Sequence, residues 1–277
     1  MRALWLLATP PAFEPRPPHA AAERFRVEPA RGIVPLADVY LPDTPGPHPS
    51  VLIVHGGGFV IGSRRMKPVR YLATRLSAAG YAAAAFDYRM IFRGGRLDES
   101  LSDLATMSAW WRSQAARFHL DLDRISLAGF SAGATLMLLH AAENGTDRYE
   151  RLVSFYGVYD FSYLSGRLAE WMRLLLLRSG DHVIWAERSP LQRCGMAAPL
   201  LLIHGTADTL VPVEHARRLQ RRREELGLPV TLCEHDGLPH GFVNDARLPA
   251  TDAAIQEMLG FLGPRRLLGS AAPGAGV

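Results

Sequence analysis

The chain of 277 residues has little cysteine and no long apolar run. Its two cysteines, Cys194 and Cys233, are too few for a disulfide framework and lack the spacing of a metal site, so we expect neither. No stretch approaches the ~18 apolar residues that a membrane-spanning helix needs. The apolar run from Ala3 to Ala8 is also shorter than the core of a signal peptide. We therefore expect a cytoplasmic protein without a membrane span.

The chain also carries little excess charge, with a net charge of +4 and 21% charged residues. The densest basic run is ARRLQRRREELG, residues 216–227. On a helix these arginines form a solvated face, and no aromatic platform or recognition motif accompanies them. We expect no nucleic-acid partner. A hydrophobic content of 48% over this length instead indicates a globular protein with a sizeable core.

Short apolar runs alternate along the chain with longer helical patterns. The apolar runs, typical of strands buried on both faces, are VLIVH (51–55), YAAAAF (81–86), RISLA (124–128), RLVSFY (151–156) and PLLLIH (199–204). Amphipathic segments between them lie near 67–79, 98–118, 132–143 and 212–226. This alternation predicts an α/β fold with a mostly parallel sheet between two layers of helices. The sheet is completed by an antiparallel pair near 25–29 and 33–41, a last strand at 230–235 and a helix at 249–262.

The pattern predicts one domain, residues 25–262, between a proline-rich arm (1–24) and a flexible tail (263–277). The stretch 157–198 is too long for a simple connection, so we expect it to form a lid-like insertion. Within it, SGRLAEWMRLLLLR (165–178) has the pattern of a helix that is apolar around much of its circumference. This helix either lines a substrate pocket or packs against the body of the protein or a second subunit of a homodimer.

The stretch GFSAG, residues 129–133, follows a predicted strand and precedes a predicted helix. It fits G-x-S-x-G, in which a serine occupies a sharp strand-to-helix turn and small neighbours allow other segments to pack closely. An ordinary tight turn is the alternative explanation of the five residues alone. The context favours an exposed nucleophile, Ser131, at the carboxyl end of a parallel strand, where ligands bind in open sheets.

A serine hydroxyl needs a histidine base, which a carboxylate in turn orients. His240, in GLPHGF, lies between the last predicted strand and the last helix, where a side chain can reach the strand ends. His204 ends a buried strand, which favours local packing or a local hydrogen bond. Asp208, in HGTAD, lies one tight turn beyond that strand, and Asp160, in FYGVYD, is the rival carboxylate. We favour His240 and Asp208.

The stretch HGGGF, residues 55–59, follows another predicted strand. One glycine suffices for a turn, so three in a row indicate backbone N–H groups that meet a ligand at close range. A phosphate-binding loop is the rival interpretation, but no G-x-x-x-x-G-K-[ST] pattern follows, and Lys67, the only lysine, lies too far along the chain. The glycine run is better explained as a source of donors for the oxyanion of an acyl-transfer reaction.

These motifs, taken in order, resemble the α/β-hydrolase superfamily. They are HGGGFVIGS, DYR (87–89), GFSAG, SPL (189–191), GTADTLVP and PHGF. Within the superfamily, the chain is similar to hormone-sensitive-lipase-like esterases and to small bacterial acetyl- and feruloyl-esterase-like enzymes. The likeness extends over residues 50–245. It implies an α/β-hydrolase fold with a mostly parallel eight-stranded sheet and a small lid.

The resemblance implies a role for each matching residue. It makes Ser131 the nucleophile of a triad with Asp208 and His240. The donors of the oxyanion hole would be the N–H groups of Gly57, Gly58 and Ala132. In DYR, the tyrosine and the arginine would support the oxyanion loop.

Two departures from the family bear on the substrate site. The family often has an aspartate immediately before the nucleophile, where this chain has Phe130. The aromatic ring should alter the surroundings of the serine without removing the machinery. The N-terminal arm is too short for a full cap, so the insertion must do more of the covering. We expect a pocket lined by Phe59, Phe130, Trp171, Met172, Leu175 and Leu176.

These roles imply a serine hydrolase that cleaves carboxylic esters through an acyl-enzyme on Ser131, with short-chain acyl or acetyl esters as the expected substrates. This chemistry needs no metal or organic cofactor. An amidase, a formamidase or a peptidase would use the same triad and is the alternative. A ligand-binding protein on the same scaffold is a further alternative, because fold alone does not determine function.

Overall fold

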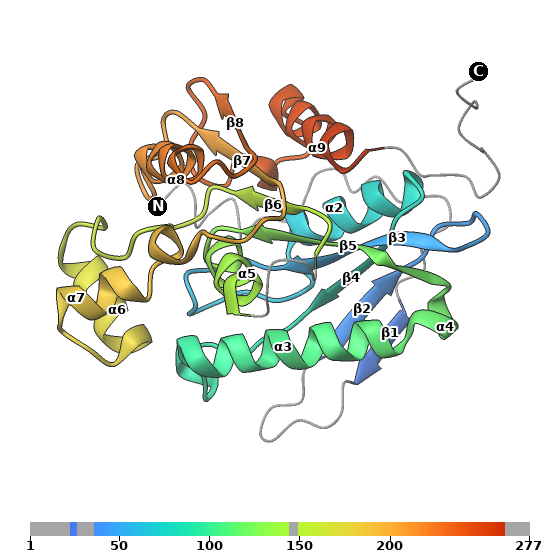
Figure 1. The fold of residues 1–277 in the computed structure, drawn as a ribbon, viewed down its shortest axis with the longest axis horizontal. Coiled ribbons are helices and arrows are strands. Elements are labelled where there is room, and N and C mark those ends of the chain that lie inside the picture. Colours follow the sequence, from blue (N-terminus) through green and yellow to red (C-terminus); the bar gives the residue numbers. More distant parts are fainter. Residues whose placement is uncertain (1–22, 27–35, 144–148, 264–277) are drawn as a thin grey trace, which may run out of the picture.

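The computed structural model describes residues 23–26, 36–143 and 149–263 of the chain (Figure 1). Its strands are β1 (Glu23–Arg26), β2 (Leu36–Tyr40), β3 (His48–Val54), β4 (Ala82–Phe86), β5 (Leu120–Phe130), β6 (Leu152–Phe155), β7 (Leu200–Gly205) and β8 (Val230–His235). They form one eight-stranded sheet in the order β1-β2-β4-β3-β5-β6-β7-β8. Neighbours from β4 to β8 are parallel, and β1 and β2 form an antiparallel edge. The predicted α/β fold with a mostly parallel sheet is confirmed.

Helices cover both faces of this sheet. They are α2 (Lys67–Ala78), α3 (Leu97–Ser113), α4 (Ala115–Phe118), α5 (Ala132–Glu143), α6 (Arg167–Leu177), α7 (His182–Glu187), α8 (Glu214–Glu225) and α9 (Pro249–Leu262). Short 3-10 helices lie at Ile91–Arg93, Pro190–Arg193 and Phe242–Asn244. The buried side chains of α2 and α9 belong to one layer of the core, and those of α3, α5 and α8 belong to the other.

The apolar side chains of β3 alternate between these two layers. Val51 and Ile53 belong to the layer of α2 and α9, whereas Leu52 and Val54 belong to the layer of α3 and α5. All four are buried, as expected for a central parallel strand that is covered on both faces. The strand therefore appears in the sequence as a continuous apolar run. Polar functional groups can follow it only at its carboxyl end.

The insertion 157–198 forms α6, α7 and the 3-10 helix at Pro190–Arg193. The helix predicted at 165–178 corresponds to α6, and α7 is an additional helix that the apolar pattern does not reveal. Asp181 caps α7 by accepting a hydrogen bond from the N–H of Val183 at 2.8 Å. In Figure 1 the two helices, in yellow, lie at the end of the molecule opposite α4.

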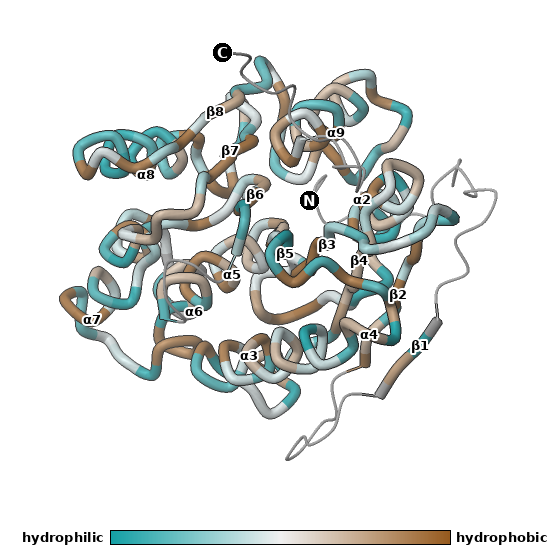
Figure 2. Tube along the Cα trace, turned by 45° about the vertical axis from the view of Figure 1, so that its right-hand side comes forward, coloured by the Kyte–Doolittle hydropathy of each residue, from teal (hydrophilic) through white to brown (hydrophobic). Residues whose placement is uncertain are grey.

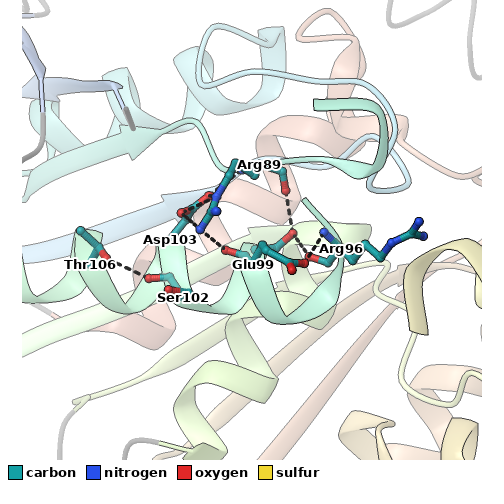
Figure 3. Close-up of polar contacts among 7 residues, drawn as sticks. Arg89, Arg96, Glu99, Ser102, Asp103 and Thr106 are labelled. Carbon is teal, nitrogen blue, oxygen red and sulfur yellow. Dashed lines mark hydrogen bonds and ion pairs between the residues drawn. The ribbon is translucent and has the colours of Figure 1, made fainter. Parts of the chain in front are cut away.

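The insertion is docked on the first turn of α3. Arg96 donates a hydrogen bond to the carbonyl oxygen of Leu175 in α6. Glu99 pairs with Arg178, just past α6, at 3.1 Å. Glu99 also accepts the Arg96 N–H at 2.8 Å, which caps α3 (Figure 3). The same turn of α3 is therefore capped and joined to the insertion.

The basic run 216–227 lies mostly on α8, which Figure 2 shows as a largely hydrophilic helix. Arg217 pairs with Glu234 on β8 at 2.6 Å, at the surface. Arg223 differs, because it is fully buried. Its guanidinium donates to backbone carbonyl oxygens of Cys194, Met196, Ala198 and Pro229. The run thus combines a solvated face with one buried structural arginine.

Within the described ranges, no helix is both long and apolar enough to cross a membrane. Most of the predicted arm and tail falls outside these ranges. Of the arm, only residues 23 and 24 are described, and they begin β1. Of the tail, only Gly263 is described, and it follows the last turn of α9.

Candidate active site

Ser131 lies at the junction of β5 and α5, where the chain turns sharply. Its φ of 51° is in the left-handed region, which residues other than glycine adopt only with strain. A hydrogen bond from the Ser131 N–H to the carbonyl oxygen of Phe155, 2.9 Å long, holds the turn against β6. A strained strand-to-helix turn of this kind exposes the hydroxyl at the end of the sheet.

The glycines beside Ser131 allow two close backbone approaches. A Cβ atom on Gly133 would lie 2.3 Å from the carbonyl oxygens of Val54 and His55, where β3 ends. A Cβ atom on Gly129 would lie 2.6 Å from the carbonyl oxygen of Gly133. Both separations are shorter than van der Waals contact. Glycine at 133 therefore lets the end of β3 pack against the serine turn, and glycine at 129 lets the start of α5 pack against the end of β5.

Ser131, His240 and Asp208 form a continuous relay of hydrogen bonds, although they come from three distant parts of the chain. His240 Nε2 lies 3.0 Å from Ser131 Oγ, and His240 Nδ1 lies 2.7 Å from Asp208 Oδ2. Because a carboxylate only accepts hydrogen bonds, Nδ1 carries the proton and Nε2 offers its lone pair to the hydroxyl. The rival carboxylate, Asp160, instead pairs with Arg218 at 2.9 Å.

The carboxylate of Asp208 is buried and yet ionised. Its side chain is 0% exposed. Oδ1 accepts the N–H groups of Leu210 and Val211 at 2.9 and 2.8 Å. Burial alone would raise the pKa of Asp208, but hydrogen bonds from His204 and His240 outweigh burial and lower the pKa to about 2. A negative charge therefore faces His240 Nδ1 at any pH near neutrality.

The glycine run lies beside the nucleophile, because a Cβ atom on Gly56 would lie 3.3 Å from the Cβ atom of Ser131. Gly57 and Gly58 have φ of 112° and 61°, in the region that favours glycine. Within the described residues, the N–H groups of Gly57, Gly58 and Ala132 donate to no other backbone or side-chain group. Unpaired N–H groups beside a nucleophile are suited to stabilising an oxyanion.

His55 and Tyr88 support the base of the glycine loop. Their rings stack with centroids 4.3 Å apart, and the Tyr88 hydroxyl donates to the carbonyl oxygen of His55 at 3.0 Å. His55 Nδ1 donates to the carbonyl oxygen of Gly56 at 2.7 Å. Burial lowers the pKa of His55 to about 4, so this stack is uncharged at neutral pH. The loop backbone thus rests on a neutral support.

The other two residues of DYR contact two different segments near the glycine loop. Asp87 accepts the N–H of Arg64, which follows the glycine loop, at 2.7 Å. The Arg64 guanidinium also donates to Asp38 at 2.8 Å. The Arg89 guanidinium donates to Asp103 of α3, at 2.8 and 3.0 Å, and among the described residues it donates to no residue of the glycine loop (Figure 3). Arg89 therefore ties the chain after β4 to α3, and Tyr88 alone of these two contacts the loop.

Three of the six residues that we expect in the substrate pocket are buried and pack with the hydrophobic core. Phe130 is 2% exposed and stacks on Phe155 with centroids 4.8 Å apart. Because the two residues are paired across β5 and β6, their rings lie side by side on one face of the sheet. The role of Phe130 in lining the pocket stays a prediction. Phe59 and Leu176 are likewise buried in the core.

The remaining expected pocket residues lie on α6. Met172 is half-buried, and its methyl carbon lies 3.4 Å from the position that a Cβ atom would take on Gly58. Leu175 is also half-buried. The side chain of Trp171 lies outside the described part of the structure. The insertion thus reaches the oxyanion loop through Met172.

Two side chains that the sequence patterns did not assign to the site contact the triad. Tyr156, with a strained φ of 40°, packs its ring edge-on against the His240 imidazole, with centroids 4.8 Å apart. His204 Nε2 lies 3.2 Å from Asp208 Oδ2. Both residues stand at the carboxyl ends of β6 and β7, the two strands that follow β5 in the order of the sheet. That position is the signal by which the sequence could have assigned them.

The strand order, the serine on a strained strand-to-helix turn and the chain order Ser131, Asp208, His240 define an α/β-hydrolase fold. The chain belongs to the BD-FAE family, which matches residues 37–222. No group of three or more His, Cys, Asp and Glu side chains arranged like metal ligands occurs among the described residues.

One curated relative and two solved structures are similar to this chain. The esterase LipC of Mycobacterium tuberculosis is 32% identical over 232 residues, which cover 76% of this chain and 57% of LipC. The chain thus spans little more than half the length of this relative. The carboxylesterase EstE1, cloned from a metagenomic library, is 21% identical with a TM-score of 0.77, over 94% of this chain and 92% of EstE1. Butyrate-bound esterase Est2 of Thermogutta terrifontis is 23% identical with a TM-score of 0.74, over 90% and 95% of the two chains.

Proposed function

We propose that this chain is a serine carboxylesterase that hydrolyses short-chain acyl esters through an acyl-enzyme on Ser131. The observation that carries the proposal is the relay of Ser131, His240 and Asp208 beside unpaired backbone N–H groups. A nucleophile, its base, the group that orients the base and donors for a developing negative charge are the parts that acyl transfer requires. The name of LipC and its likeness to this chain support the same activity.

Acylation begins when Ser131 Oγ attacks the carbonyl carbon of the ester. His240 Nε2 takes the hydroxyl proton, and the buried carboxylate of Asp208 stabilises the resulting imidazolium. The negative charge moves to the carbonyl oxygen, which accepts hydrogen bonds from the N–H groups of Gly57, Gly58 and Ala132. The intermediate collapses as the carbon–oxygen bond to the alcohol breaks, and His240 Nε2 returns its proton to the departing oxygen. An acyl-enzyme is left on Ser131.

Deacylation repeats the sequence with water as the nucleophile. Water replaces the alcohol beside His240 Nε2, which removes one of its protons as the oxygen attacks the acyl carbon. The tetrahedral oxyanion again accepts hydrogen bonds from the backbone donors. When the bond to Ser131 Oγ breaks, His240 returns the proton to the serine, and the carboxylic acid leaves.

The preference for short acyl chains is proposed from the insertion. Met172 approaches Gly58 closely, so the space above the oxyanion loop is limited on the side of α6. Est2, which has the same fold, has been solved with propionate and with butyrate bound. An acyl group of that size is compatible with a site covered in this way.

The proposal is tested with a series of p-nitrophenyl esters: acetate, butyrate, octanoate and laurate. We expect turnover of the acetate and butyrate, and a decline toward the laurate as the chain meets α6. The p-nitroanilides of the same acids serve as matched substrates, because they differ only in the bond that is cleaved. Hydrolysis of the anilides or of formanilide without ester turnover would establish an amidase instead. A folded protein that cleaves none of them would point to a binding protein.

Replacing Met172 by alanine is expected to shift the chain-length profile toward longer esters. Removing the side chain next to Gly58 opens space for the substrate, and a methylene group in an apolar pocket changes kcat/KM by about 10-fold or more. We therefore expect the ratio of kcat/KM for octanoate to that for acetate to rise by about 10-fold. Steady-state kinetics with the same ester series gives this ratio.

A matched control lies on the same helix. Leu174 is 46% exposed, so Leu174→Ala removes a side chain of similar size from the outside of α6. Its chain-length ratio should stay at the wild-type value. Equal shifts in both variants would show that α6 acts through its overall stability and that Met172 does not limit the substrate.

A further inference from the structure

His204, near the end of β7, is a buried histidine that the proposed reaction does not use. The whole residue is 0% exposed. Its Nε2 faces two oxygen atoms, Asp208 Oδ2 at 3.2 Å and the Val211 carbonyl oxygen at 2.8 Å. Both oxygens are acceptors, so Nε2 must carry a proton that is shared between them. One imidazole thus bridges the triad carboxylate and the backbone of the turn that follows it.

This bridge completes the hydrogen bonding of the carboxylate. Oδ1 is already held by the N–H groups of Leu210 and Val211, and Oδ2 is shared by His240 and His204. With four donors in fixed positions, the plane of the carboxylate cannot rotate without loss of a bond. Among these donors, His204 is the only side chain besides His240.

We propose that His204 is a positioning residue of the triad, which fixes the carboxylate plane of Asp208 and closes the 208–211 turn so that Oδ2 stays aligned with His240 Nδ1. The inference rests on the proposed serine-esterase function. Without the imidazole of His204, the carbonyl oxygen of Val211 and Asp208 Oδ2 would face each other without a shared proton. Their repulsion would turn the carboxylate away from its alignment with His240.

A purely structural role explains His204 less well. Its Nδ1 is buried and has no hydrogen-bond partner among the described residues. An unpaired buried nitrogen destabilises the fold, and an apolar residue like the preceding Leu202 and Ile203 would avoid that loss. The single hydrogen-bonding edge of the ring points to Asp208 and Val211, which is the edge that positioning needs.

The other ionisable groups around His204 are either neutral or paired with an arginine. His215 on α8 has a pKa lowered to about 4 by burial, so it adds no charge at neutral pH. Its Nδ1 accepts the N–H of Tyr159 at 3.4 Å. Glu234, opposite His204 on β8, pairs with Arg217, and Asp160 pairs with Arg218. Asp208 is therefore the charged group that His204 contacts directly.

The test compares three substitutions of His204 that keep or remove the donor at the position of Nε2. His204→Phe fills the space without a donor, and His204→Asn keeps polarity but is too short to reach. His204→Gln can place its amide N–H where Nε2 lies. We expect the first two to lower kcat by about 10- to 100-fold at unchanged KM, as misalignment of a reacting group does. His204→Gln should recover most of the lost activity.

Two further readouts separate positioning from general stability. The acid limb of the pH dependence of kcat/KM should move in His204→Phe and His204→Asn and return in His204→Gln. The low-field proton resonance of the hydrogen bond between His240 Nδ1 and Asp208 should shift or broaden in the same two variants. His215→Phe is the matched control, since it replaces a neighbouring buried histidine that does not touch the carboxylate, and it should leave kcat, the acid limb and the resonance as in the wild type.

The outcomes distinguish the two proposals. Wild-type kcat and an unchanged resonance in folded His204→Phe or His204→Asn would overturn the role of His204 while the esterase proposal stands. A wild type without ester turnover would end the esterase proposal, and the resonance would then decide on His204 by itself. If His204→Phe does not fold, the pair His204→Asn and His204→Gln carries the test, and equal loss of activity in both would contradict the inference.

Discussion

Ser131→Ala is expected to lower kcat for p-nitrophenyl acetate by a factor on the order of 10⁶. The substitution removes the atom that forms the acyl-enzyme. The expected loss of kcat equals that from removing all three triad residues, because the three act as a unit. Ser131 has a φ of 51°, and we expect alanine to adopt the same backbone conformation, so the fold should persist. Initial rates of purified variant and wild type, with circular dichroism to confirm folding, give the comparison.

A substitution of a second triad residue and a labelling experiment complement this comparison. Asp208→Asn should lower kcat by about 10⁴-fold, less than Ser131→Ala, because the amide leaves the hydroxyl in place but orients the imidazole wrongly. A fluorophosphonate should label the wild type once per chain and leave Ser131→Ala unlabelled. Retention of activity and of labelling in Ser131→Ala would show that the nucleophile is another residue, and the relay described above would lose its role.

Gly57→Ala is expected to lower kcat by about 10²- to 10³-fold, the effect of losing an oxyanion donor. At this position φ is 112°, and an added Cβ atom would lie 1.7 Å from the carbonyl oxygen of Ile61. That carbonyl belongs to the loop itself, which is closed by hydrogen bonds from the N–H groups of Val60 and Ile61 to the Gly57 carbonyl oxygen at 3.1 and 3.0 Å. The loop must open to admit the methyl group, and its N–H groups then no longer point toward the oxyanion. Kinetics with p-nitrophenyl acetate measures the loss.

Gly94→Ala provides the control for the backbone strain alone. Gly94 also has a positive φ, 76°, but a Cβ atom there would meet nothing within 4 Å. We expect it to lose about 1–2 kcal/mol of unfolding free energy, as a non-glycine residue in the left-handed region does, and to keep the wild-type kcat. If Gly57→Ala were as active as Gly94→Ala, the oxyanion would have to be stabilised elsewhere.

Most of the fold follows from the sequence because its central strands are covered on both faces. Such strands show as unbroken apolar runs, and the runs at 51–55 and 199–204, each followed by a glycine, end within one residue of the carboxyl ends of β3 and β7. The amino end of β3 lies three residues before its predicted run, at His48. The helical pattern at 98–118 hides a break at Gln114, which separates α3 from α4. The break does not show in the sequence because neither glycine nor proline marks it.

The candidate site was predictable where chemistry restricts the residue type. A nucleophile on a tight turn, its base and a run of glycines each leave a short local pattern, and from these patterns we predict the roles of Ser131, His240 and Gly57. Side-chain direction leaves no such pattern: Phe130 adjoins Ser131 in the sequence, yet the pleat of β5 turns its ring onto Phe155. The contact between His204 and Asp208 depends in the same way on how the turn after β7 folds back.

The strained backbone of Ser131 also bears on how the protein can be made more robust. A left-handed conformation is accessible to glycine but unfavourable for serine, so the backbone at Ser131 lowers the free energy of unfolding. The proposed chemistry nevertheless requires serine at this position. Selection for thermal stability alone would favour glycine there and would discard the activity. Efforts to raise the melting temperature should therefore leave the corner between β5 and α5 unchanged and look to exposed positions such as Leu226, on the surface after α8.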